Sequence, residues 1–258
     1  MTTTTSSADI TTAATVSDET VASYRRNGFV RIPSVLSPEQ VERYRDAAAA
    51  AHERFESYHK DDIFKQIVNL WTRDPVIAEL TMNANLAEIA TKLAGVPLRL
   101  WHDHLLVKKP HNKLPTEFHQ DAPYWPHATS RHCLSAWIAL VDVPVERGCM
   151  SFLPGSHLRH DIRPANLADA TDLFSAAPDL VYSPRVTLPL RAGDCTFHNG
   201  YTAHTANSND TDEYRYAHIV IYTDRDTTFD GKPHVVTDPL GLSVGDRLPD
   251  DACPPLPR

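Results

Sequence analysis

Leu98-Arg-Leu-Trp-His-Asp-His-Leu-Leu-Val107 begins the strand-rich part of the chain. The segment is rich in branched and aromatic residues, and it stops at the turn residues Lys109-Pro110. Segments of the same kind recur toward the C-terminus with turns between them, a spacing that is typical of β-sandwiches and barrels. We therefore predict a mainly β fold. The further predicted strands are Ser135–Val143, Val186–Leu190, Asp194–His198 and Tyr216–Thr223.

The residues before this strand-rich part carry helix signals. Ser17-Asp-Glu-Thr20 resembles an N-cap followed by an acidic first turn, so we predict a helix that begins near Ser17. Ser37-Pro-Glu-Gln40 is a capping box with proline at the first helical position, and it predicts a helix over Val41–Phe55. Ile77–Leu93 is typical of another helix, and Gly28–Ile32 alternates like a short strand. We expect the helices to pack outside the β core.

The domain organisation follows from composition. Residues 1–16 are rich in Thr, Ser and Ala, which predicts a disordered N-terminal tail. The remaining residues, 17–258, show no internal repeat, and we interpret them as a single domain with flanking helices.

The charge balance excludes several kinds of partner. The 258 residues contain 25 Lys plus Arg and 33 Asp plus Glu, which gives a formal net charge of −8. A chain of that sign is a poor ligand for polyanions, so we predict no nucleic-acid partner. No apolar run approaches the roughly 20 residues that a membrane-spanning helix needs, so we predict no membrane partner.

The cysteines and the N-terminus indicate a compartment. The four cysteines lie far apart without a C-x-x-C pair, which excludes a zinc ribbon and a thioredoxin-type motif. Sparse cysteines in a large chain fit a reducing compartment. Because the N-terminus lacks the basic and apolar regions of a secretory signal, we predict a cytoplasmic protein, either a monomer or a homodimer.

The densest cluster of ligand-type residues is Thr116-Glu-Phe-His-Gln-Asp-Ala-Pro-Tyr-Trp125. In an extended segment residues i and i+2 point to the same face, so His119 and Asp121 can converge on one ion. An imidazole and a carboxylate suit a divalent metal such as Fe(II). A second histidine would complete a set of three ligands on one face of the metal and leave its other coordination positions open to small molecules. The alternative is a surface histidine and aspartate near a turn.

A second cluster lies around His198 and His204, and either imidazole could be the third ligand, with His204 the first candidate. Arg215 follows at the start of a predicted strand. A guanidinium that points into a β core needs an anionic partner, because an unpaired buried charge is costly, and its planar fork suits a carboxylate. The alternative for Arg215 is a structural salt bridge to Asp212 or Glu213.

Several motifs together resemble one known family. They are, in chain order, Asn27–Pro33, Ser37–Gln40, His119-Gln-Asp121, Trp137, Gly148–His157, Gly193-Asp194, His204 and Arg215. In this order and spacing they resemble the phytanoyl-CoA dioxygenase family of Fe(II)- and 2-oxoglutarate-dependent oxygenases, over about residues 17 to 225. The resemblance implies a double-stranded β-helix, which is a jelly-roll, cupin-like barrel with helices that brace one sheet.

The resemblance also implies a role for each matched position. His119, Asp121 and His204 match the iron ligands. Arg215 matches the arginine that binds the distal carboxylate of 2-oxoglutarate, and Trp137 matches an aromatic residue beside that cosubstrate.

Two further residues resemble family positions near the cosubstrate, although the sequence around them matches the family less closely. Lys65 lies where some members place a lysine near the C1 carboxylate of 2-oxoglutarate, and His104 maps to the wall beside the cosubstrate. Many members have serine two residues after the distal histidine, where this chain has Ala206. A different hydroxyl must therefore compensate. The candidates are Thr205, Thr116 and Tyr216.

The implied activity is an oxidation by O2 of an unactivated C–H bond, most simply a hydroxylation, with release of succinate and CO2. Related halogenases lack the carboxylate ligand, so Asp121 implies an oxygenase. The acidic average charge disfavours a coenzyme A substrate, so we predict a small-molecule metabolite, with specialised-metabolite biosynthesis as its setting. The alternatives are an acyl-CoA hydroxylase and a cupin-like metalloenzyme that does not use 2-oxoglutarate. Tyr124, Trp125 and Lys108 are candidate substrate contacts. The alternative for the two aromatic residues is plain packing, and the alternative for Lys108 is a solvated loop.

Overall fold

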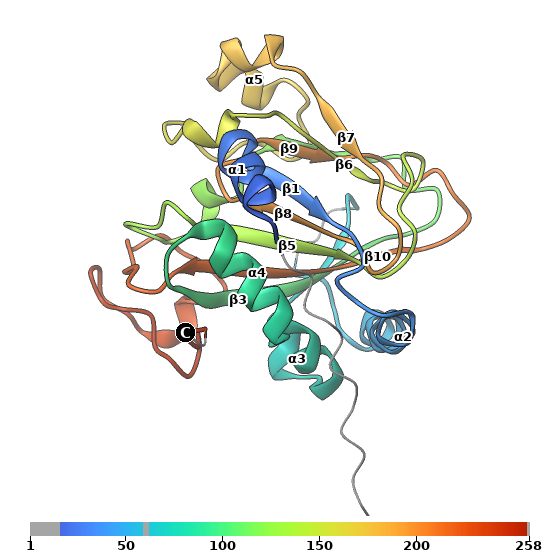
Figure 1. The fold of residues 1–258 in the computed structure, drawn as a ribbon, viewed down its shortest axis with the longest axis horizontal. Coiled ribbons are helices and arrows are strands. Elements are labelled where there is room, and N and C mark those ends of the chain that lie inside the picture. The colour runs from blue at the N-terminus through green and yellow to red at the C-terminus, as the bar shows by residue number, and fades with distance from the viewer. Residues whose placement is uncertain (1–15, 59–61, 257–258) are drawn as a thin grey trace, which may run out of the picture.

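A computed structural model of the chain describes residues 16–58 and 62–256. Two antiparallel sheets face each other (Figure 1). The six-stranded sheet consists, in spatial order, of β1 (Phe29–Ile32), β8 (Cys195–Asn199), β5 (Leu134–Ala139), β10 (Arg215–Asp224), β3 (Leu98–Lys108) and β2 (Lys65–Val68). The four-stranded sheet consists of β4 (Thr116–His119), β9 (His204–Ala206), β6 (Met150–Phe152) and β7 (Val186–Leu188). The helices are α1 (Asp18–Asn27), α2 (Pro38–Arg54), α3 (Pro75–Thr81), α4 (Ala84–Ala94) and α5 (Asp172–Ala176).

Helices α1 to α4 lie on the outer side of the six-stranded sheet, as Figure 1 shows, and bury their apolar faces against it. The two sheets with helices that brace one of them confirm the predicted jelly-roll architecture. The described strands form two separate sheets, and among these strands no hydrogen-bonded pairing joins the sheets into a closed barrel. The predicted barrel is therefore better described as a sandwich with a cavity between its layers.

The helix signals of the sequence are confirmed at their N-termini. The side chain of Ser17 accepts a hydrogen bond from the backbone N–H of Thr20, and Ser37 and Gln40 form the reciprocal capping box. The single helix predicted over Ile77–Leu93 is wrong, because α3 ends at Thr81 and α4 begins at Ala84. The side chain of Asn83 caps the first turn of α4, and an N-cap residue takes up a non-helical backbone conformation that interrupts the helix.

The alternation of side chains across the six-stranded sheet separates two cores. Along β5, Ala136 and Ile138 pack under the helices, whereas Trp137 and Ala139 face the four-stranded sheet. The same alternation along β3, β8 and β10 supplies the inner face that the site is built on. The short strands β2, β4, β6 and β9, of three or four residues each, were not among the predicted strands.

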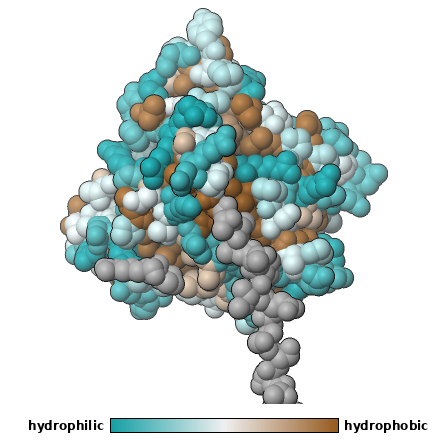
Figure 2. All heavy atoms as spheres, viewed as in Figure 1, coloured by the Kyte–Doolittle hydropathy of each residue, from teal (hydrophilic) through white to brown (hydrophobic). Residues whose placement is uncertain are grey.

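The N-terminal tail prediction falls almost wholly on residues 1–15, which lie outside the described residues, so it stays a prediction. Val16, the last residue of the predicted tail, is buried in the core under the helices. On the face drawn in Figure 2, hydrophilic residues surround smaller apolar patches. Within residues 16–58 and 62–256, no helix has the length and apolar character that crossing a membrane requires.

Candidate active site

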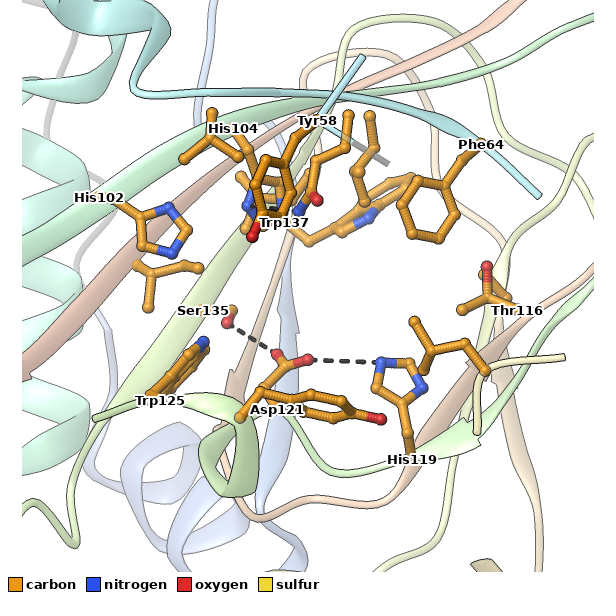
Figure 3. A pocket seen from close by; sticks show the side chains of 18 of the residues that line it. Tyr58, Phe64, His102, His104, Thr116, His119, Asp121, Trp125, Ser135 and Trp137 are labelled. Atoms are coloured by element: carbon orange, nitrogen blue, oxygen red, sulfur yellow. Dashed lines mark hydrogen bonds and ion pairs between the residues drawn. The ribbon is translucent and has the colours of Figure 1, made fainter. Parts of the chain in front are cut away.

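A cavity of about 300 Å³ lies between the two sheets. Its walls come from the inner faces of β2, β3, β5 and β10, from β4 and β9 opposite, and from the segment 233–235. Figure 3 shows His102, His104 and Trp137 on one wall and His119 and Asp121 on the wall that faces it. Most of the sequence-predicted site residues meet here, but Lys65 and Lys108 do not line this cavity.

His119, Asp121 and His204 converge in this cavity. One ligand atom from each lies within 4.8 Å of the other two. The Nε2 atom of His119 is 3.4 Å from Oδ1 of Asp121, and the Nε2 atom of His204 is 3.8 Å from the same oxygen. Two imidazoles and one carboxylate on one face are a donor set for a divalent transition metal.

The hydrogen bonds of the two histidines orient their Nε2 lone pairs toward this centre. Nδ1 of His119 donates to the backbone carbonyl of Glu117 at 2.8 Å, and Nδ1 of His204 donates to that of Thr202 at 2.9 Å. A carbonyl can only accept, so each ring carries its hydrogen on Nδ1 and keeps Nε2 free to ligate. Burial and the neighbouring imidazole of His119 lower the pKa of His204 to about 3, so its ring is neutral and ready to bind a metal.

Asp121 reaches the centre by a route that differs from the predicted one. Strand β4 ends at His119, and Asp121 has a helical backbone conformation just before the 3-10 turn Ala122–Tyr124. The extended i, i+2 geometry is therefore wrong. The Nε2 atom of the intervening Gln120 donates to the carbonyls of Ser156, Arg159 and Tyr201, at 3.3, 2.9 and 2.6 Å. This buried amide fixes the turn that brings the carboxylate beside the imidazole.

The substitution Gln120→Glu tests that role. It places a carboxylate against three carbonyl oxygens, so we expect the free energy of unfolding to fall by about 3 kcal/mol or more, the cost of an unsatisfied buried charged group. Chemical denaturation measures this fall. Stability equal to that of the unaltered protein would show that the amide does not hold the turn.

His198, the competing third ligand, stands beside the centre. Its Nε2 atom is 3.5 Å from Oδ2 of Asp121, the oxygen that also accepts from Ser135 Oγ at 3.2 Å (Figure 3 shows the serine contact). The pair His119 and His204 faces Oδ1 instead. His198 is not in the group whose ligand atoms all lie within 4.8 Å of one another, although its ring centre is 4.6 Å from that of His204, and this favours His204 as the third ligand.

Arg215 is the second charged feature of the cavity. It is 1 % exposed, its guanidinium carbon lies 5.3 Å from the centre of the Trp137 ring, and its Nη1 donates weakly to Gly148 at 3.4 Å. Its Nε is buried without a hydrogen-bond partner in the described part of the chain. Burial lowers the pKa of Arg215 to about 10, so the group is still a cation at neutral pH.

The two acids that could form a structural salt bridge with Arg215 pair with other groups. Glu213 pairs with Arg147 at 2.8 Å, and Asp212 pairs with His111 at 2.8 Å. Neither acid neutralises Arg215. A buried guanidinium without a carboxylate partner among the described residues fits a site for an anionic ligand.

Thr116 is the candidate hydroxyl residue that lies beside Ala206 in the cavity. Strands β4 and β9 pair it directly with Ala206, and both residues line the cavity. The other candidate hydroxyls are less suited, because Thr205 donates to the Thr116 carbonyl at 2.7 Å and Tyr216 packs on the helix side of its strand. Thr116 is therefore the hydroxyl best placed to compensate for Ala206.

Lys65 is not brought to the cavity. It pairs with Val107, whose side chain faces the helices, and its Nζ donates to the carbonyl of His52 at 2.6 Å. The next residue, Gln66, lines the cavity and bonds to Nδ1 of His104 at 3.3 Å. Adjacent residues of a strand face opposite sides, so Lys65 points away from the cavity that Gln66 lines. His104 does line the cavity, as predicted.

Lys108 is buried instead of lying in a solvated loop or on the cavity wall. Its Nζ donates to the carbonyls of Leu114 and Asn207, each at 2.9 Å, and to that of Ala206 at 3.5 Å. Burial and the nearby charge of Arg215 lower its pKa to about 6. Its contacts tie the end of β3 to the chain after β9, so the predicted substrate contact is replaced by a structural one.

We expect Lys108→Met to lower the free energy of unfolding by about 2 kcal/mol, because it leaves buried carbonyls without donors. The matched control is Lys113→Met, since Lys113 is exposed and its surface ion pair with Asp210 contributes little. Thermal unfolding of both variants makes the comparison. Equal melting temperatures would contradict the structural role.

Tyr124 and Trp125 line the cavity, as predicted. The hydroxyl of Tyr124 donates to the carbonyl of Ala165, and Trp125 is 5 % exposed. Each therefore contributes both to packing and to the cavity wall. Gln66, Ser135 and His234 also line the cavity, and no local sequence motif marks them.

The fold and the site together define a class of protein. A jelly-roll sandwich that brings two histidines and one carboxylate to one wall, with a buried arginine beyond them, has the architecture of the non-haem iron enzymes that use 2-oxoglutarate. The free Nε2 atoms and the unpaired guanidinium show that the residues present fit both an Fe(II) ion and a dicarboxylate. The model of the family described as phytanoyl-CoA dioxygenase (PhyH) matches residues 24–217. The chain belongs to this family, which confirms the resemblance.

Known relatives agree with this assignment. Phytanoyl-CoA dioxygenase domain-containing protein 1 of Mus musculus is 28 % identical over 156 residues, which cover 58 % of this chain and 54 % of the relative. The chain thus spans about half the length of the curated relatives it matches first.

Two solved structures are similar over nearly the whole chain. The non-heme alpha ketoglutarate dependent carbocyclase SnoK from nogalamycin biosynthesis has a TM-score of 0.86 and 39 % identity, and the match covers 96 % of this chain and 99 % of SnoK. The epimerase SnoN, in complex with Fe3+, alpha ketoglutarate and nogalamycin RO, has a TM-score of 0.81 and 36 % identity, with 92 % and 97 % covered. SnoK is named as dependent on alpha ketoglutarate, which is 2-oxoglutarate, and the SnoN structure contains this compound.

Proposed function

We propose that the protein is an Fe(II)- and 2-oxoglutarate-dependent dioxygenase that oxidises a C–H bond of a small-molecule metabolite in a specialised biosynthetic pathway. The observation that carries the proposal is the convergence of His119, Asp121 and His204 in the same cavity as the unpaired cation of Arg215. The similarity to SnoK and SnoN supports the biosynthetic setting.

Each residue has a distinct task in this proposal. His119, Asp121 and His204 hold the iron, and Arg215 binds the distal carboxylate of 2-oxoglutarate beside Trp137 and the hydroxyl of Thr116. When bound, the iron and 2-oxoglutarate supply the oxidation of a C–H bond by O2, with succinate and CO2 as products. The chain positions these groups, and the apolar walls from Trp137, Met150 and Ile219 exclude water from them.

The alternatives are less well supported by the cavity. A cupin-like enzyme without 2-oxoglutarate would not need the buried cation of Arg215. An acyl-CoA substrate would bring several phosphate charges, and the only formally charged side chains among the described lining residues are Asp121 and Arg215. Both already have roles in the proposal.

A cytoplasmic location and a monomeric or homodimeric state also stay proposals. The four cysteines, Cys133, Cys149, Cys195 and Cys253, are free and buried, which fits a reducing compartment.

The proposal is tested by succinate formation. With Fe(II), 2-oxoglutarate and O2, the purified protein is expected to form succinate slowly even without a further substrate. An Asp121→Ala variant, which lacks the carboxylate ligand, should form none. Absence of succinate from the unaltered protein at high concentration, measured by mass spectrometry, would reject the cosubstrate.

A further inference from the structure

Two further histidines line the cavity far from Arg215. Strands β3 and β10 pair Lys108 with Arg215 at one end and His102 with Ile221 toward the other. His102 is six positions from Lys108 along β3, so their Cα atoms are roughly 20 Å apart. The backbone positions of Arg215 and His102 therefore lie toward opposite ends of the cavity wall, and the His102 end is open to another ligand.

A β-bulge aims His102 into the cavity. The pairing of β3 with β10 shifts so that Tyr222 is opposite Leu100 and Ile221 is opposite His102, which leaves Trp101 as the extra residue. A bulge of this kind redirects the side chains that follow it. Leu100 packs under the helices, whereas His102, two residues later, faces the cavity, as Figure 3 shows.

The hydrogen bonds of His102 leave an acceptor without a partner. Nδ1 of His102 is 3.1 Å from the carbonyl oxygen of Asp103, so Nδ1 carries the hydrogen and Nε2 carries a lone pair. This Nε2 is buried and has no partner in the described part of the chain, and the residue is 3 % exposed. Burial, with the neighbouring imidazoles, lowers the pKa of His102 well below its ordinary value, so the ring is neutral.

His234 has the complementary arrangement. The backbone N–H of Val236 donates to its Nδ1 at 3.3 Å, so the hydrogen of the neutral ring is on Nε2. Burial lowers the pKa of His234 to about 4, which keeps the ring neutral at pH 7. The rings of His102 and His234 are 5.4 Å apart and both line the cavity. The pair thus offers one acceptor and one donor.

The walls around this pair are apolar and aromatic. They include Trp125, Ile221, Pro233 and Val235. Flat aromatic walls with a few placed polar groups favour a rigid ring compound. No lysine, glutamate or further arginine lines the cavity within the described residues, so nothing there would neutralise a charged substrate.

We propose that His102 and His234 bind one hydroxyl group of the substrate, which donates its hydrogen to His102 Nε2 and accepts from His234 Nε2–H. The substrate class is then an uncharged, hydroxylated ring compound. This inference rests on the proposed function of the same cavity, and it makes the two histidines residues that determine specificity.

A matched pair of probes tests it. The probes are 2-naphthol and 2-methoxynaphthalene, which share a flat ring system but differ in the O–H donor. Fluorescence titration of the full-length protein without oxygen, with and without Fe(II) and 2-oxoglutarate, is expected to show about tenfold tighter binding of 2-naphthol, the worth of one buried hydrogen bond.

The variants assign the preference to the two rings. His102→Phe and His234→Phe should each remove most of the preference, and His102→Gln, which keeps an acceptor, should retain part of it. His160→Phe is the control, because His160 contacts Tyr201 and does not line the cavity. Cooperative thermal unfolding shows whether each variant is folded. If His102→Phe does not fold, the probe preference of His234→Phe tests the inference.

Two results would overturn the inference: equal affinity of the unaltered protein for the two probes, or no binding of either. The titration without iron and 2-oxoglutarate tests the hydroxyl site independently of the proposed oxygenase function. A hydroxyl preference without succinate formation rejects the oxygenase and keeps the hydroxyl site, whereas succinate formation without the preference does the reverse.

Discussion

Alanine at position 204 is expected to abolish Fe(II) binding. His204 is buried and neutral, and its Nε2 lies 3.8 Å from Oδ1 of Asp121, within the group of converging ligand atoms. Loss of a ligand should cost more than the roughly 10–100-fold that loss of a group bonded to a ligand costs. Anaerobic calorimetric titration with Fe(II) measures the affinity, and succinate formation should disappear with it.

The matched control uses the neighbouring imidazole. His198→Gln keeps a donor to Oδ2 of Asp121 and should change the iron affinity by no more than a few fold. An unchanged affinity of His204→Ala, or a lost affinity of His198→Gln, would exchange the roles of the two histidines.

The second large effect is expected at Arg215. Truncation to alanine removes the only buried cation that lines the cavity among the described residues and leaves the distal carboxylate of 2-oxoglutarate unpaired. Loss of one partner of a buried charge pair costs about 2–5 kcal/mol, so the concentration of 2-oxoglutarate needed for half-maximal succinate formation should rise by orders of magnitude.

Two controls separate ligand binding from structure. Arg215→Lys keeps the charge but not the planar fork, so its requirement for 2-oxoglutarate should lie between those of the alanine variant and the unaltered protein. Fe(II) binding should persist in both variants, because Arg215 is not in the ligand cluster. An unchanged 2-oxoglutarate requirement in Arg215→Ala would assign the residue to structure alone.

The sequence predicted the iron site better than its surroundings. The residue types of His119 and Asp121 suggested a metal site, and the family resemblance added His204 as the third ligand. The path of the chain between them could not be predicted, because the Gln120 amide bonds to carbonyls from distant segments. The residues that converge were therefore predicted, but with the wrong local geometry.

For the other cavity residues, the sequence could not predict the strand register that decides which side chains face the cavity. Lys65 and Gln66 are adjacent, and only the pairing of β2 with β3 decides which of them faces the cavity. The bulge at Trp101 likewise changes the face of every later residue in β3, and no residue of that segment marks it. His234 belongs to an irregular segment with no periodicity, so its place beside His102 depends on tertiary packing alone.

A crystal structure with iron and 2-oxoglutarate, grown without oxygen, tests the central claim most directly. The account predicts an anomalous iron peak within bonding distance of His119 Nε2, an Asp121 oxygen and His204 Nε2, with the distal carboxylate of 2-oxoglutarate on the Arg215 guanidinium. Iron bound by a different set of side chains, or a dicarboxylate that does not touch Arg215, would contradict it.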